Sequence, residues 1–66
     1  MDMSKIGKRL VELRGDKTQN EVADAVGISI SALSMYEQGN RMPRDEIKMR
    51  LAAHYGTTVE SIFYAL

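Results

Sequence analysis

Backbone breakers placed at short intervals limit this chain to short helices. The interrupting residues are Gly15, Gly27, Gly39, Pro43 and Gly56. Between them apolar residues recur at steps of three and four, which is typical of amphipathic helices, and no useful β-type alternation is present. Because the chain has 66 residues, 44% of them hydrophobic, it can bury one core and no second domain. We therefore expect one all-α domain over residues 1–66 with five short helices.

The composition argues against several classes of function. The absence of cysteine and the single histidine, His54, leave no disulfide framework and no thiolate or histidine metal site. A nucleophile with a base and an orienting group cannot be assembled, so we expect no enzymatic activity and no cofactor. The apolar runs are far shorter than the roughly 20 residues of a membrane helix, and no signal peptide is present. We expect a soluble, cytoplasmic protein with no small-molecule ligand and no membrane partner.

The centre of the chain predicts two helices joined by a tight turn. Thr18 and Glu21 form a capping box, in which the hydroxyl accepts from the Glu21 amide and the carboxylate reaches back. Ser29 is suited to cap the next helix, which we expect to end near Gln38. With Gly27 between them, residues 18–38 match a helix-turn-helix, whose second helix is presented to the DNA major groove. The predicted inner side chains are Val22, Ala23, Val26, Leu33 and Tyr36.

The flanking helices are predicted from the same kinds of signal. A first helix, about Ser4 to Arg14, has Ile6, Leu10 and Leu13 on one apolar stripe. Pro43 fits the first turn of a fourth helix, since its fixed φ suits that position. The fourth helix buries Ile47, Leu51 and Tyr55, and a second capping box at Thr57 and Glu60 begins a last helix containing Val59, Ile62, Phe63 and Leu66.

Three runs along the chain carry a resemblance to a known family. They are TQNEVA at 18–23, GIS at 27–29 and SMYEQGNRMP at 34–43. The ordered set resembles the DNA-binding domain of lambda-repressor-like (Xre-type) bacterial and phage transcription regulators, over nearly the whole chain from Ile6 to Phe63. The resemblance implies a compact five-helix domain that binds operator DNA, commonly as a symmetric dimer.

The resemblance also implies roles for individual residues. The positions that read base edges are Ser29, Ile30, Ser31, Ser34 and Met35. None is Arg, Lys, Asn or Gln, so we expect permissive readout that relies on hydroxyls, thymine methyl groups or DNA shape. The positions suited to phosphate contact are Gln19, Asn40, Arg41, Arg44 and Arg9. The structural alternatives are that Ser29 only caps its helix and that Arg41 and Arg44 only keep the loop solvated.

The end of the chain and the overall charge leave the partner open. The apolar residues Ile62, Phe63, Tyr64 and Leu66 cannot all face inward at helical spacing, so they are candidate contacts of a homodimer. The alternative is that Tyr64 and Leu66 fray at the terminus.

Nine basic and nine acidic residues give a formal net charge of 0, which provides no global attraction to DNA. We predict a small repressor that binds a pseudo-palindromic operator; the rival is the same scaffold used as a protein-interaction module, antitoxin-like or anti-repressor-like.

Overall fold

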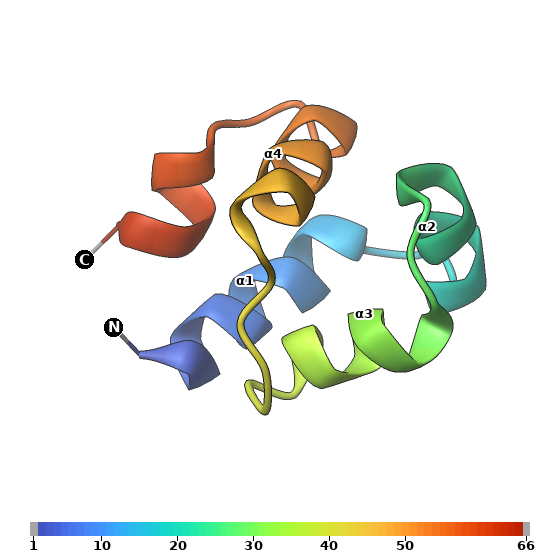
Figure 1. Cartoon of the computed structure of the whole chain (residues 1–66), viewed down its shortest axis with the longest axis horizontal. Helices are drawn as coiled ribbons and strands as arrows, with labels where there is room; N and C mark the ends of the chain where they lie inside the picture. Colours follow the sequence, from blue (N-terminus) through green and yellow to red (C-terminus); the bar gives the residue numbers. More distant parts are fainter. Residues whose placement is uncertain (1, 66) are drawn as a thin grey trace.

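Five helices make up the regular structure of the computed structural model, which describes residues 2–65 (Figure 1). They are α1 (Met3–Arg14), α2 (Gln19–Val26), α3 (Ile30–Glu37), α4 (Asp45–His54) and the short π-helix η1 (Glu60–Tyr64). No strand occurs within residues 2–65. The predicted all-α, five-helix fold is confirmed.

Polar side chains begin α1, α2 and α3. Asp2 Oδ1 accepts from the backbone amides of Ser4 and Lys5, at 3.0 and 3.3 Å. Thr18 Oγ1 accepts from the Glu21 amide at 3.1 Å, and Ser29 Oγ accepts from the Ala32 amide at 3.0 Å. Each cap satisfies an amide that has no partner inside its helix. The predicted starts of α2 and α3 are therefore confirmed.

The starts of the last two helices differ from the prediction. Pro43 is buried and precedes the N-cap of α4, which is Arg44, so the proline does not lie in the first turn of that helix. The N-cap residue of η1 is Val59, and the threonine that bonds to the first turn is Thr58 in place of Thr57: its Oγ1 accepts from the Ser61 amide at 3.1 Å. Two adjacent threonines make both registers plausible in sequence, and only the packing of η1 selects between them.

The core lies where the inner faces of all five helices meet. Its buried hydrophobic side chains are Ile6, Leu10, Val22, Ala23, Val26, Leu33, Tyr36, Leu51, Ala52, Ile62 and Phe63. Ile47, Tyr55 and Val59 pack against this core as partly buried side chains. Leu13 was predicted to continue the stripe of α1 but is 39% exposed. It lines an open hollow of about 250 Å³ between α1 and the residues Thr57, Ser61 and Ile62, which leave it partly exposed.

Helix α1 lies in direct backbone contact with the end of α3 at Gly7. A Cβ placed on Gly7 would lie 2.3 Å from the carbonyl oxygen of Glu37, a distance that atoms do not tolerate. Glycine at this position therefore lets α1 lie against the last turn of α3. This contact fixes the position of α3 relative to α1.

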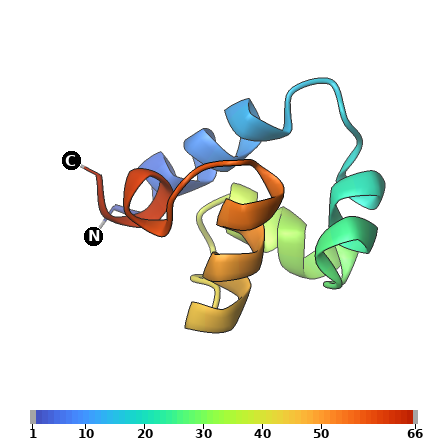
Figure 2. The same ribbon diagram turned by 90° about the horizontal axis from the view of Figure 1, so that it is seen from above.

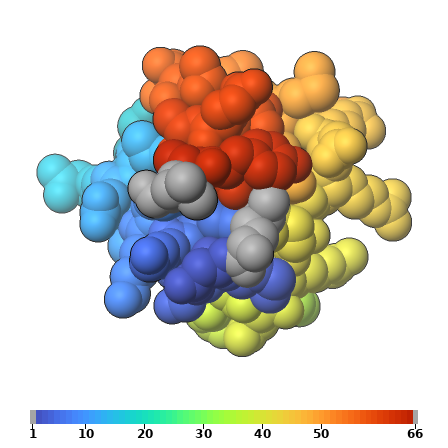
Figure 3. Space-filling model, turned by 90° about the vertical axis from the view of Figure 1, so that its left-hand side faces the viewer, coloured from blue at the N-terminus to red at the C-terminus, as the bar shows by residue number. Residues whose placement is uncertain are grey.

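The molecule has two separate ends. In Figures 1 and 2, α2 lies at one end, and the first turn of α1 lies at the other, beside η1. Figure 3 views this second end and shows η1, in red, packed over α1, in blue. Along the described residues, no helix combines the length and the apolar character needed to cross a membrane.

Candidate nucleic-acid interface

A tight turn at Gly27 sets the position of α3 relative to α2. Gly27 has φ +83°, in the left-handed region that glycine adopts at little cost. The amides of Gly27 and Ile28 both donate to the Ala23 carbonyl, each at 2.9 Å. Val22 and Leu33, both fully buried, lie in the core between the two helices and the rest of the chain. This packing places α2 and α3 in the arrangement predicted for a helix-turn-helix.

The outer face of α3 is not covered by the described residues. Ile30 is 47% exposed and Met35 is 39% exposed, and Ser31 between them is also exposed. Ser34 is half-buried and accepts from Gln38 Nε2 at 2.9 Å. Ser29 Oγ accepts a hydrogen bond from the Ala32 amide, as the side chain of a helix N-cap does. The four candidate base-reading residues beyond the cap thus lie along an accessible face of α3.

The loop between α3 and α4 brings two arginines close to the start of α3. Arg41 and Arg44 are exposed, and neither side chain makes a hydrogen bond or an ion pair with any residue in the range 2–65. Both line a hollow of about 280 Å³ that also includes Ser29, at the N-terminus of α3. Asn40 donates its side-chain amide to Gln38 Oε1 at 3.0 Å. The two guanidinium groups are therefore available to an anion beside α3, while the Asn40 amide has an internal partner.

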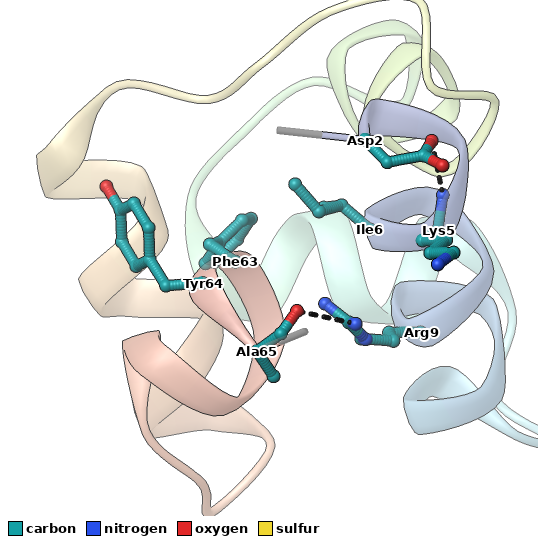
Figure 4. Close-up of a pocket in the computed structure, with 7 residues that line it drawn as sticks. All are labelled: Asp2, Lys5, Ile6, Arg9, Phe63, Tyr64 and Ala65. Atoms are coloured by element: carbon teal, nitrogen blue, oxygen red, sulfur yellow. Dashed lines mark hydrogen bonds between the residues drawn. The ribbon is translucent and has the colours of Figure 1, made fainter.

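Arg9, another candidate phosphate contact, is used inside the molecule. Its Nη1 and Nη2 atoms donate to the carbonyl oxygens of Ile62 and Ala65, both at 2.8 Å. Figure 4 shows the guanidinium reaching from α1 toward Ala65, beside Ile6 and Phe63. These bonds satisfy carbonyls at the end of η1 that have no helical partner. The geometry assigns Arg9 to the docking of η1 on α1, and its phosphate contact stays a prediction.

A buried polar group that sequence reasoning missed joins α1, α2 and α3 at Glu37. The Glu37 side chain is 3% exposed, and its Oε2 accepts from Arg14 Nε at 2.8 Å. Its Oε1 accepts from Gln19 Nε2, also at 2.8 Å. Arg14 Nη1 in addition donates to the Lys17 carbonyl at 2.7 Å. The signal in the sequence is that Glu37 follows the inward-facing Leu33 by four residues, which places both on one helix face.

The pKa values of two residues in and near this group, Arg14 and Tyr55, are raised. The hydrogen bond to Glu37 raises the pKa of Arg14 above its ordinary value, because the charged guanidinium is the form that the carboxylate stabilises. Burial raises the pKa of Tyr55, and the Glu37 carboxylate raises it further, while Arg14 opposes the shift. The Tyr55 hydroxyl is buried and has no hydrogen-bond partner among the described residues. Arg14 and Tyr55 therefore both stay protonated at neutral pH.

Lys48, on the inner side of α4, is the second polar residue whose place the sequence did not suggest. Lys48 is only 7% exposed, and its Nζ donates to Tyr64 Oη at 2.9 Å. The ammonium lies over the rings of Tyr64 and Phe63, 5.0 and 5.6 Å from their centroids. A cation is attracted to the face of an aromatic ring. Lys48 thus holds η1 against α4 and is not part of an exposed basic surface.

The structure buries two of the four predicted dimer contacts and exposes a third. Ile62 and Phe63 are each 1% exposed and belong to the core, so the prediction that they contact a second copy is wrong. The π-helical turn, together with the anchoring by Arg9 and Lys48, places both side chains inward. Tyr64 is 49% exposed and stays accessible. Leu66 lies outside the described residues.

Comparison with known proteins identifies the arrangement. No curated protein and no solved structure matches the chain. The family model described as Helix-turn-helix matches residues 8–62, which run from the middle of α1 into η1. The match covers most of the chain, including α2, the turn at Gly27 and α3. The chain belongs to the lambda-repressor-like helix-turn-helix family of DNA-binding regulators.

Proposed function

We propose that this protein represses transcription by binding, as a homodimer, a pseudo-palindromic operator through α3. The observation that carries the proposal is the uncovered outer face of α3 beside two arginines, Arg41 and Arg44, that have no hydrogen-bond or ion-pair partner among the described residues. Guanidinium groups bind phosphate oxygens through paired N–H donors. Operator occupancy then blocks access of the polymerase to the promoter.

The side chains of α3 define the kind of sequence readout. Ile30 and Met35 are apolar and exposed, which suits contact with thymine methyl groups. Ser31 offers one hydroxyl, which can bond to either kind of base edge. Without a bidentate amide or guanidinium on this face, the contacts to phosphate provide most of the affinity. We expect moderate discrimination between operators and a strong dependence on salt.

The dimer contact is proposed for the end of the molecule opposite α2. Tyr64 is exposed there and lines a hollow of about 310 Å³ between α1 and η1 (Figure 4). Asp2, Lys5, Arg9 and Ala65 also line this hollow, while Ile6 and Phe63 at its base are almost fully buried and belong to the core. A twofold contact would place two α3 helices about 34 Å apart, one turn of DNA, which requires a pseudo-palindromic site.

Selection of duplexes from a random pool, followed by mobility-shift titration at two salt concentrations, tests the proposal. We expect enrichment of a site with twofold symmetry and binding that weakens steeply as salt rises, with roughly two to four ionic contacts per protomer. Ser31→Ala and Met35→Ala should change the preference among sequences by about 1 kcal/mol without changing the salt dependence. Failure to enrich any duplex, even at low salt, would contradict the proposal.

The apolar character of the α3 face favours a second candidate function. An exposed face with Ile30 and Met35, on a chain of zero formal charge, also suits a protein partner, as in an antitoxin or an anti-repressor. This function predicts no enriched duplex, no effect of Arg41→Ala on partner binding and a strong loss with Met35→Ala. The two candidate functions are therefore separated by whether Arg41→Ala weakens duplex binding or Met35→Ala weakens binding of a protein partner.

A further inference from the structure

The buried carboxylate of Glu37 holds Gln19, a residue that the sequence predicts to contact a DNA phosphate. Gln19 is the first residue of α2, is partly exposed, and is a candidate phosphate contact. Its Nε2 donates to Glu37 Oε1 at 2.8 Å. Arg14 contacts the other carboxylate oxygen and also the Lys17 carbonyl, two residues before Gln19. One acidic side chain thus connects the end of α3 to the start of α2 and to the loop before it.

The chemistry of the contact determines how the Gln19 amide is oriented. An ionised carboxylate accepts hydrogen bonds and donates none, so the nitrogen of the Gln19 amide, and not its oxygen, must face Glu37. The amide nitrogen carries two N–H groups, and one of them remains available beside this bond. Because Glu37 is 3% exposed on its side chain and is paired with Arg14, its own charge is shielded from an approaching phosphate.

We propose that Glu37 is a positioning residue for DNA binding, which holds the Gln19 amide so that its second N–H donates to a backbone phosphate. The inference rests on the proposed DNA-binding function. A side chain that is already held in its bound geometry loses less conformational entropy on binding, so the contact gains affinity. Simple charge repulsion predicts the reverse for Glu37, since removal of an acidic residue should strengthen binding to a polyanion.

The first test compares Glu37→Gln with a matched control, Glu60→Gln, on the selected operator duplex. Both variants remove one negative charge, but Glu60 is exposed and its side chain makes no hydrogen bond or ion pair among the described residues. We expect Glu37→Gln to weaken binding by about fivefold, the cost of immobilising one side chain. Glu60→Gln should bind as tightly as the parent or slightly tighter. Equal or tighter binding by Glu37→Gln would overturn the inference.

A second test shows whether Glu37 acts through Gln19. Gln19→Ala alone should weaken binding by a similar factor, and adding Glu37→Gln to it should cause no further loss. Losses that multiply in the double variant would mean that Glu37 acts on the structure in general, and the inference would fail. If the parent protein binds no duplex at all, the proposed function fails first, which is a distinguishable outcome.

A charge-neutral double variant keeps the inference falsifiable if Glu37→Gln does not fold. Replacing the ion pair with Arg14→Met and Glu37→Met retains volume, and such replacements of buried pairs are often neutral or stabilising. It also removes the acceptor of Gln19, so the same loss of operator affinity is expected.

Nuclear magnetic resonance of this double variant supplies a local signature. The Gln19 side-chain N–H signals should move toward those of a free glutamine, while the backbone amide signals of α2 keep their positions. Unchanged Gln19 signals would contradict the inference.

Discussion

The arginines of α1 and those of the loop before α4 have the same chemistry but opposite surroundings. Arg9 and Arg14 each donate two hydrogen bonds within the molecule, to carbonyls at the end of η1 in one case and to Glu37 and Lys17 in the other. Arg41 and Arg44 have no such partner among residues 2–65. The comparison teaches that a count of basic residues overstates the DNA-binding surface, because half of these arginines hold helices together.

The largest expected effect is the loss of stability caused by Arg14→Ala. The substitution leaves the Glu37 carboxylate buried without its cation, and breaking a buried pair by removing one partner costs about 3 kcal/mol. Urea unfolding followed by circular dichroism measures this cost, with Arg41→Ala as the control that should unfold like the parent. A loss below about 1 kcal/mol would show that the pair is solvated in solution.

A smaller loss of stability is expected for Arg9→Ala, together with local opening of η1. Two hydrogen bonds from a charged donor to carbonyl oxygens disappear, one of them at an exposed site, for a total of about 1 to 2 kcal/mol. Hydrogen exchange should accelerate at the amides of η1 and stay unchanged in α2. The folded fraction should bind the operator like the parent, and weakened binding with an altered salt dependence would identify Arg9 as a phosphate contact.

Arg41→Ala should leave stability within about 0.5 kcal/mol of the parent, because the exposed side chain has no polar partner within residues 2–65. Binding should instead weaken on every duplex by about threefold to tenfold, and the slope of log affinity against log salt should fall by about one. Mobility-shift titration across several salt concentrations measures both. An unchanged slope would place Arg41 outside the phosphate contacts.

The smallest expected effect lies inside the buried group, at Tyr55. Because its pKa is raised by burial in the folded state, the unfolded chain releases the phenolic proton first as the pH rises. The contribution of Tyr55 is fully present below about pH 10, the ordinary pKa of tyrosine, and is lost above it. Unfolding measured between pH 7 and 11 should show a flatter decline for Tyr55→Phe than for the parent. At pH 7 we expect a change below about 1 kcal/mol, since the lost hydroxyl had no partner.

The fold was largely readable from the sequence because its signals are local. The caps at Thr18 and Ser29 and the turn at Gly27 depend on residues within four positions of each other, and all three form where predicted. The predicted reciprocal bond from the Thr18 amide to the Glu21 carboxylate is absent among the described residues. The start of η1 was less certain, because Thr57 and Thr58 offer the same chemistry one residue apart.

The site was only partly readable because several of its features are contacts between distant residues. Spacing alone places Ile62 and Phe63 on a helix but does not show that Arg9, 53 residues earlier, binds the carbonyl of Ile62 and holds η1 in the core. Glu37 likewise lies 18 residues from Gln19 and 23 from Arg14, so no local sequence pattern predicts that these three side chains are in contact. The exposed face of α3 and the two loop arginines, in contrast, follow from helical period and motif position.

The backbone contact at Gly7 gives α1 an influence over the surface that we propose faces DNA. Only the hydrogen atoms of Gly7 fit against the Glu37 carbonyl, so one added methyl group would push α1 and α3 apart. The displacement would pass along α3 to its far end, where Ile30 and Ser31 begin the exposed face. If α3 binds an operator as proposed, a change at Gly7 should therefore alter that binding from a position outside the proposed DNA-binding face.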